Sequence, residues 1–255
     1  MSSIAPVLTP GLLAAIRKQP NLPRNSWYFI TATTLSILNR PDELPKVYTH
    51  AIDEDIDTTG GTAKQENHLR VSRRMREALI KASAVGGMPK TINALMALKT
   101  ITPEELLDTA SGEENPSSRY RDLYETPAPQ VLQRGQSFFD KLYGKIAKRV
   151  MGQMDRSGSE DLGLMAKLVY GYIISNTDVL SPVETSFVLI ASLIPQDVNP
   201  QLKGHLRGAL NGGASVDEVR AVRDVVIKIC EASGMRNLSH DAVGGWGWRT
   251  EVANV

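Results

Sequence analysis

Residues 215–234, SVDEVRAVRDVVIKICEASG, decide the fold of this chain. The apolar residues of one helical face recur at spacings of three and four: Val219, Val222, Val226 and Ile229. Ser215, followed three residues later by Glu218, forms the capping-box pattern that satisfies free amides at a helix start. Gly234 is a typical helix end. The stretch therefore predicts a helix over residues 216–232 with one buried face.

The same stretch has an earlier counterpart in the chain. Residues 76–81, REALIK, match residues 223–228, RDVVIK, and each is followed by a Gly-Met pair at a constant offset of 147 positions. Six positions after each glycine the copies differ, because the first has Asn93 and the second has His240. We infer two related helical repeats, one kept for packing and the second carrying the titratable groups.

Helical periodicity covers most of the chain, and the strict alternation of a half-buried strand is rare, so the sequence predicts an all-α fold. We expect a diverged N-terminal copy with its linker over residues 1–127 and a second helical domain over 128–255, packed together. Residues 53–66 and the proline-rich 111–129 are predicted as a loop and a linker. The predicted helices cover residues 10–18, 26–38, 43–52, 70–85, 89–98, 102–109, 129–152, 159–174, 182–194 and 216–232.

The composition excludes several classes of protein. Lys and Arg number 29 against 28 Asp and Glu, and the net charge of +1 argues against binding to nucleic acid or to an anionic membrane. A single cysteine, Cys230, cannot form an internal disulfide, which fits a reducing compartment. The chain has neither a signal-peptide pattern nor an apolar run of about 20 residues, and it ends in Ala-Asn-Val rather than a Ser-Lys-Leu type signal. We therefore expect a cytoplasmic protein.

Three elements in the second half form a recognisable set. They are the Ser-x-x-Glu helix start at Ser181 and Glu184, the string HLRGALNGG at residues 205–213, and Gly234 with His240 six residues later. This set resembles the carboxymuconolactone decarboxylase family of the alkylhydroperoxidase D-like superfamily, over about residues 130–245. The resemblance implies an all-helical fold, assembly into homo-oligomers such as trimers, hexamers or dimers, and a lyase or isomerase activity.

The chain departs from that family at informative positions. The peroxidase branch carries Cys-x-x-Cys before the histidine, where this chain has Val198 and Gln201, so a two-cysteine redox mechanism is excluded at that site. The family's Asn-His-Ala is here Ser239-His240-Asp241. These differences leave the substrate open.

The leading hypothesis is a cofactor-free enzyme that acts on a small carboxylated or carbonyl-bearing substrate. His205 and His240 would donate and accept the proton, because an imidazole titrates near neutral pH. Glu184 would orient one of them, and Arg207 would hold the substrate anion. The histidine spacing forms no recognised metal-ligand cluster, so neither a metal nor a cofactor is implied.

Each of these residues also has a structural interpretation that the sequence leaves open. His205 could bond a neighbouring helix, Glu184 already serves a capping box, and Arg207 could lie at the surface. The alternative functions are a catalytically silent oligomeric binding or structural member, or a peroxidase that uses Cys230 alone, although that thiol fits a packing role. Trp246 and Trp248, among glycines, would cap a pocket mouth or meet another subunit.

Overall fold

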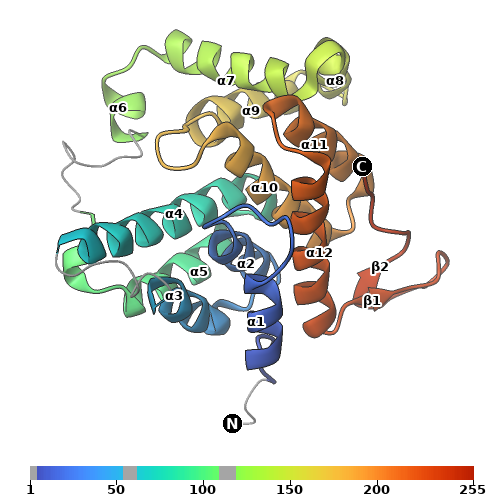
Figure 1. Ribbon diagram of the computed structural model, residues 1–255. Coiled ribbons are helices and arrows are strands. Elements are labelled where there is room, and N and C mark those ends of the chain that lie inside the picture. The colour runs from blue at the N-terminus through green and yellow to red at the C-terminus, as the bar shows by residue number, and fades with distance from the viewer. Residues whose placement is uncertain (1–4, 54–61, 109–118) are drawn as a thin grey trace.

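The computed structural model describes residues 5–53, 62–108 and 119–255, and it confirms the all-α class (Figure 1). In the described residues the strands are two short ones that pair in parallel, β1 (Arg236–Asn237) and β2 (Gly247–Trp248). The helices are α1 (Pro10–Arg17), α2 (Trp27–Ile37), η1 (Pro41–Glu43), α3 (Leu44–Asp53), α4 (Thr62–Gly86), α5 (Met88–Ile101), η3 (Glu104–Leu106), α6 (Arg119–Tyr124), α7 (Ala128–Tyr143), η4 (Gly144–Ile146), α8 (Ala147–Met154), α9 (Asp161–Val169), η5 (Tyr170–Ile174), α10 (Pro182–Leu193), η6 (Ile194–Gln196), α11 (Asn199–Gly212) and α12 (Val216–Ala232).

Both predicted capping boxes are formed. The Ser181 hydroxyl accepts from the Glu184 amide at 3.3 Å, and the Glu184 carboxylate accepts from the Ser181 amide at 2.9 Å. At the start of α12, Ser215 and Glu218 make the same two bonds, at 3.1 and 2.8 Å. These bonds satisfy amide donors that an uncapped helix start leaves unpaired, which is why α10 and α12 begin where the sequence predicts.

The two halves repeat one order of elements and share one hydrophobic core. The series α2, η1, α3, α4 recurs as α10, η6, α11, α12. All eleven residues of α2 are buried, as are most residues of α10, and these two helices contact each other at the centre. Helix α4 packs on α10 and helix α12 packs on α2, so each half covers the central helix of the other (Figure 1). The predicted packing of the halves is thereby explained, and the boundary near residue 127 stays a prediction.

The arginine and the lysine that recur in both copies donate hydrogen bonds to carbonyl or side-chain amide oxygens of other chain segments. Arg76 donates to the Leu106 carbonyl at 3.2 Å, and Arg223 donates to the Val252 and Ala253 carbonyls at 2.6 and 2.8 Å. Lys81 donates to two carbonyls near the end of η5, whereas Lys228 donates to the side chain of Gln19. In each half the arginine therefore fastens a segment that lies C-terminal to its own helix, which is a packing role.

The boundaries differ from the predicted ones where glycine or a change of helix type intervenes. The predicted helix 129–152 is broken after α7 by Gly144, which has a φ of +54° that L side chains rarely adopt. Helix α4 begins at Thr62, inside the predicted loop 53–66. In the described part of the predicted helix 102–109, residues 102–108, the structure forms only the short turn η3, and the predicted 159–174 changes from α to π geometry at η5. The first part of the predicted linker, 111–118, and residues 54–61 of the predicted loop lie outside the described residues.

Two glycines let α7 lie close to its neighbours. A Cβ at Gly135 would lie 2.5 Å from the backbone amide of Gly171 in η5, and a Cβ at Gly208 would lie 2.5 Å from a methyl of Leu142. Both distances are shorter than real carbon contacts. The absence of a side chain at these positions therefore sets how closely α7 approaches η5 on one side and α11 on the other.

Candidate functional site

Glu184 of the second half is bound by an arginine of the first half. The Arg74 guanidinium of α4 donates to the Glu184 carboxylate at 2.5 Å, across a sequence separation of 110 residues. Burial opposes ionisation of Glu184, but the hydrogen bond and charge of Arg74 outweigh it and lower the pKa of this carboxyl. Glu184 is therefore an anion at neutral pH, and its partner is Arg74 rather than a histidine.

Arg74 is held by further contacts from the first half. Its Nε donates to the Tyr28 hydroxyl at 2.8 Å, and its Nη2 donates to the Asn25 carbonyl at 3.0 Å. The guanidinium carbon lies 5.1 Å from the centre of the Phe29 ring, within cation–π distance. These contacts fix the plane of the guanidinium at the junction of α2, α4 and α10.

One face of α4 borders a cleft with a volume of about 420 Å³, which we name the arginine cleft. Three arginines of α4 line it, together with Leu69 on the same helix and Val179 in the segment before α10. Two acidic residues complete the lining, so that the full set is Glu66, Leu69, Arg70, Arg73, Arg74, Asp178 and Val179. The cleft thus joins residues of both halves, and it shares Arg74 with Glu184.

Arg73 is positioned by an acidic residue outside the cleft. Its Nε and Nη2 donate to the same oxygen of Asp108, at 3.0 and 2.8 Å. The other oxygen of Asp108 accepts from Arg76, one of the repeated arginines. Because Asp108 has two arginine partners, only one of which lines the cleft, it can lose Arg73 and remain paired.

His205 lies elsewhere, buried between α11 and α7. Its side chain is enclosed, and the Nε2 atom is 3.4 Å from the Tyr143 hydroxyl, which is 3.5 Å from the Tyr170 hydroxyl. Nδ1 of His205 is buried without a hydrogen-bond partner. Burial lowers the pKa of His205 to about 4, so the imidazole is neutral at physiological pH. The arrangement matches the structural alternative for this histidine, a ring bonded to a neighbouring helix.

His240 and Arg207 are both exposed. His240 lies on a turn after β1, and in the described residues no helix follows α12. Asn93, its sequence counterpart, lies on helix α5 and donates to the side chain of Asn39 at 3.1 Å. The similarity of the two copies therefore ends at the Gly-Met pair, and the comparison of His240 with Asn93 compares a turn with a helix.

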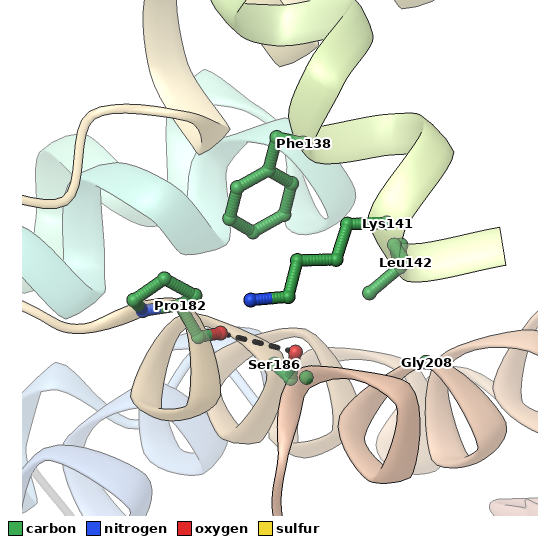
Figure 2. A pocket seen from close by; sticks show the side chains of 7 residues that line it. Phe138, Lys141, Leu142, Pro182, Ser186 and Gly208 are labelled. Atoms are coloured by element: carbon green, nitrogen blue, oxygen red, sulfur yellow. Dashed lines mark hydrogen bonds between the residues drawn. The ribbon is translucent and has the colours of Figure 1, made fainter. Parts of the chain in front are cut away.

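The four predicted site residues thus lie in different surroundings. Glu184 is bound to Arg74, His205 is bonded to Tyr143, and His240 and Arg207 lie at the surface. No hydrogen bond given by the structure joins any two of them. None of the four lines the arginine cleft or the second, smaller cleft shown in Figure 2. The geometry gives no support to a shared proton-transfer site for the two histidines.

A second, smaller cleft of about 50 Å³ lies between α7, α10 and α11 (Figure 2). Phe138 and Leu142 of α7 face Pro182 and Ser186 of α10, and Lys141 extends toward the start of α10 (Figure 2). The Ser186 hydroxyl donates to the Pro182 carbonyl at 3.1 Å, so it is engaged within its own helix. The lining is almost wholly apolar, and the volume suits a side chain or a few waters better than a substrate.

Cys230 is fully buried in α12, and burial raises the pKa of its thiol far above the usual range. A protonated, enclosed thiol is a poor nucleophile toward peroxide.

Trp248 is buried, and its indole nitrogen donates to the Ile194 carbonyl at 2.8 Å, whereas Trp246 is exposed. Within the described ranges the structure shows no group of three or more potential metal-ligand side chains and no helix long and apolar enough to span a bilayer.

Sequence reasoning missed Arg74 and the cleft that it lines. The signal was present, because Arg70, Arg73 and Arg74 follow one another at spacings of three and one within a helical pattern. This spacing places charged residues on one side of a helix. The spacing does not indicate which residues of the other half contact this side of the helix.

Two curated proteins match this chain over most of its length. The protein named Peroxisomal protein 2 in Schizosaccharomyces pombe is 33% identical over 211 residues, covering 82% of this chain and 87% of that protein. The protein of the same name in Saccharomyces cerevisiae is 32% identical over 254 residues, covering 83% of this chain and 90% of its own. This chain belongs to the peroxisomal protein 2 family. No model of a known protein family matches the chain, and no solved structure matches it.

Membership of this family corrects two expectations. The predicted membership of the carboxymuconolactone decarboxylase family is wrong, because the relatives carry a different family name. Many helical proteins use helix caps and glycines, so a short string of them does not distinguish this family from others. The predicted cytoplasmic location is contradicted as well, since the name places these relatives in the peroxisome. Cysteine content and a missing signal peptide distinguish the secretory route from the rest of the cell, but not the cytosol from the peroxisome.

Proposed function

We propose that this protein binds a small molecule with one carboxylate and an apolar portion in the arginine cleft, and that it does so in peroxisomes. One observation carries the proposal: three arginines of α4 line a cleft of about 420 Å³ at the junction of the two halves. Clefts of about 300 to 1,000 Å³ are the usual size of small-molecule sites. The planar guanidinium fork of arginine matches a carboxylate with two parallel hydrogen bonds.

The charges around the cleft favour a ligand with a single negative charge. Glu66 and Asp178 also line the cleft, and Asp108 and Glu184, which do not line it, form ion pairs with Arg73 and Arg74. These four carboxylates outnumber the three arginines that line the cleft, and because Asp108 is shared with Arg76, four carboxylates balance four arginines. A polyanion such as a phosphate ester would meet uncompensated repulsion, whereas a monocarboxylate with a hydroxyl or amino group could bond both kinds of side chain.

The apolar part of the ligand would contact Leu69 of α4 and Val179 before α10. Both are partly buried and line the arginine cleft. Removing even a short alkyl chain from water contributes about 0.8 kcal/mol for each buried CH₂. The carboxylate would thus fix the orientation, and the alkyl chain would add affinity.

The names of the relatives support the proposed peroxisomal location. Both matching proteins are named for the peroxisome, and each is aligned over more than four fifths of this chain. A family that shares its fold over this length commonly shares its compartment. Microscopy of the fluorescently tagged protein tests this part, and a cytosolic signal in cells with normal peroxisomes would reject it.

Proton-transfer catalysis in the same cleft is a second candidate function, and one observation favours it. Glu184 is an ionised, partly exposed carboxylate that touches Arg74, one of the arginines that line the cleft. A carboxylate beside a bound carbonyl compound can remove a proton from it. The lowered pKa of Glu184 makes this carboxylate a weak base, so binding is the function that the geometry supports best.

The test is a binding screen on purified protein. Short- and medium-chain monocarboxylates, with and without a 2-hydroxyl group, would be compared with their methyl esters and with a phosphate ester by thermal shift and calorimetry. We expect at least one carboxylate to bind while its methyl ester does not. Binding of the esters as well as the acids, or of none of the acids, would reject the proposal. Turnover of a bound acid that is lost in Glu184→Gln, with binding kept, would support the second candidate.

A further inference from the structure

Lys81 of α4 is fully buried and binds the backbone where η5 ends. Its Nζ donates to the Ile174 carbonyl at 2.6 Å and to the Asn176 carbonyl at 2.5 Å. The Glu77 carboxylate, one turn earlier on α4, lies 3.5 Å from the same Nζ. An ammonium has three hydrogens to donate and no lone pair, so the charged form of Lys81 matches a site built from oxygen atoms.

Two arginines bind the same stretch of backbone. Arg119 of α6 donates to the Ile173 carbonyl at 3.0 Å, and Arg134 of α7 donates to the Gly171 carbonyl at 3.0 Å. Together with Lys81 they form what we name the cation cluster. Because the three side chains come from three different helices, the cluster fixes the end of η5 relative to α4, α6 and α7.

The stretch that the cation cluster binds continues directly into the lining of the arginine cleft. Asp178 and Val179, two and three residues after Asn176, are the lining residues of that cleft that lie outside α4. Ser181 then starts α10 with its capping box. This short segment is therefore held at both ends, at Asn176 by Lys81 and at Ser181 by the cap, and the position of Asn176 helps to set where Asp178 and Val179 lie.

We propose that Lys81 is a positioning residue for the arginine cleft, and that a ligand binds there only while this lysine is charged. The role of Lys81 rests on the proposed binding of a monocarboxylate and adds a regulation of that site by pH. A neutral amine has two hydrogens and a lone pair, so deprotonation removes one donor and leaves the lone pair among oxygen atoms. The segment after η5 then loses a fixed point, and the cleft loses the geometry that the ligand needs.

The surroundings of Lys81 set the pH range. Burial lowers the pKa of Lys81 to about 8, Glu77 opposes this shift, and Arg119 and Arg134 add to it. Asp122 binds Arg134 at 2.6 Å and offsets part of its charge. Lys81 is therefore charged below pH 8 and neutral above it, so the affinity of the cleft should be complete near pH 7 and fall as pH rises through 8.

Other titratable groups on the elements around α4 are engaged away from Lys81. Tyr28 of α2 and Glu184 of α10 both bind Arg74, seven residues before Lys81. The Tyr170 hydroxyl of η5 lies 3.5 Å from a tyrosine hydroxyl of α7. Between pH 7 and pH 9 arginines stay charged, and the raised pKa of Tyr28 keeps its phenol neutral. The change of charge in this range thus falls on Lys81.

Isothermal titration of the wild type with the monocarboxylate that binds best tests the pH dependence. The charged fraction of Lys81 falls to about a tenth at pH 9, so affinity should be roughly tenfold weaker there than at pH 7. Binding at pH 8 should also take up about half a proton, measured in two buffers of different ionisation enthalpy. Equal affinity at pH 7 and pH 9, or binding without proton uptake, would overturn the proposal.

A matched pair of lysine variants assigns the effect. Lys81→Met removes the ammonium, and Lys90→Met removes a lysine of α5 that also donates to a backbone carbonyl, that of Ile37, at 2.7 Å. We expect Lys81→Met to bind at least tenfold more weakly at pH 7 with no further loss at pH 9, and Lys90→Met to behave as wild type. Wild-type affinity in Lys81→Met, or an equal loss in Lys90→Met, would reject the role of Lys81. Circular dichroism checks that each variant is folded, and the wild-type profile decides the question if Lys81→Met is not.

Failure of this role and failure of the proposed function give different results. A wild type that binds the acid equally at pH 7 and pH 9 keeps the arginine cleft as a carboxylate site and rejects only the role of Lys81. A wild type that binds no monocarboxylate at pH 7 rejects both.

Discussion

Arg74 and Glu184 form an ion pair that joins the two halves of the chain, with 2.5 Å between Nη2 and Oε1. Neither side chain is more than about a fifth exposed, so water screens the pair less than a pair on the open surface. Arg74 also lines the arginine cleft, and the Glu184 carboxylate also accepts from the amide that starts α10. The same contact therefore supports the packing of the halves and the geometry of the proposed binding site.

Loss of this pair should destabilise the fold. Arg74→Gln and Glu184→Gln are each expected to lower the free energy of unfolding by about 1 to 3 kcal/mol, because each leaves a partly buried charge without its partner. Urea denaturation measures both values. The double variant should be less destabilised than the sum of the single variants, since the second change removes a partner that is already missing. Additive effects would mean that the two side chains are not energetically coupled.

The same pair predicts how stability depends on acid. The folded pKa of Glu184 is lowered, so its contribution is complete above the unfolded value of about 4.5 and is lost as pH falls below it. In Glu184→Gln this part of the acid dependence should be missing. The difference in unfolding free energy between wild type and variant should therefore shrink on acidification through this range. A constant difference would contradict the assignment.

His205 predicts a second dependence on pH. Burial lowers its folded pKa from 6.5 to about 4, so the unfolded chain binds a proton between these values while the folded protein does not. The contribution of a neutral His205 to stability is thus present above pH 6.5 and falls toward pH 4. Nuclear magnetic resonance of the imidazole should show a neutral ring at pH 6. A midpoint near 6.5 for His205 would contradict its enclosure between α7 and α11.

Lys81 is fully buried, and its ionisation should make the stability of the fold depend on pH above neutrality. Burial, partly opposed by Glu77, lowers its pKa from 10.5 to about 8, so a charged Lys81 costs stability below pH 8 and that cost is relieved between the two values. Compared with Lys81→Met, the wild type should therefore gain stability as pH rises through this interval. Glu77 stays paired with Arg119 in the variant, at 2.6 and 2.7 Å. A flat difference across the interval would show that Lys81 is not buried as a charge.

Helix α7 lies so close to η5 at Gly135 that adding one methyl group there should destabilise the fold. Gly135→Ala should lower the free energy of unfolding by about 1 to 3 kcal/mol, because its Cβ would meet backbone atoms rather than a movable side chain. Gly11→Ala in α1 is the control, since a Cβ there meets nothing within 4 Å. That change should be neutral or stabilise by up to about 1 kcal/mol. Equal effects of both variants would contradict the packing described for α7.

Local signals were enough to predict most of the long helices, although α11 is not among the predicted ranges and α4 begins before the predicted start. The capping boxes at Ser181 and Ser215 depend on contacts between residues three positions apart, which a sequence displays directly. Breaks that depend on one glycine, such as Gly144 after α7, were hidden within a longer helical pattern. The change to π geometry in η5 has no local sequence signal that we can identify.

The candidate site could not be predicted in the same way, because it depends on contacts between distant parts of the chain. Glu184 was found from its capping pattern, but its partner Arg74 lies 110 residues away. His205 was found from the string at residues 205–213, whereas its burial depends on how α7 packs against α11. His240 was found from its contrast with Asn93, but Asn93 lies on helix α5 whereas His240 lies on a turn after the short strand β1.

Binding of a carboxylate in the arginine cleft is the central claim, and one matched pair of variants tests it most directly. Arg73 and Arg76 both bind Asp108, and only Arg73 lines the cleft. Isothermal titration with the monocarboxylate that binds best should show affinity reduced at least tenfold in Arg73→Gln and unchanged in Arg76→Gln. Equal affinity in wild type and Arg73→Gln, or an equal loss in both variants, would contradict the account.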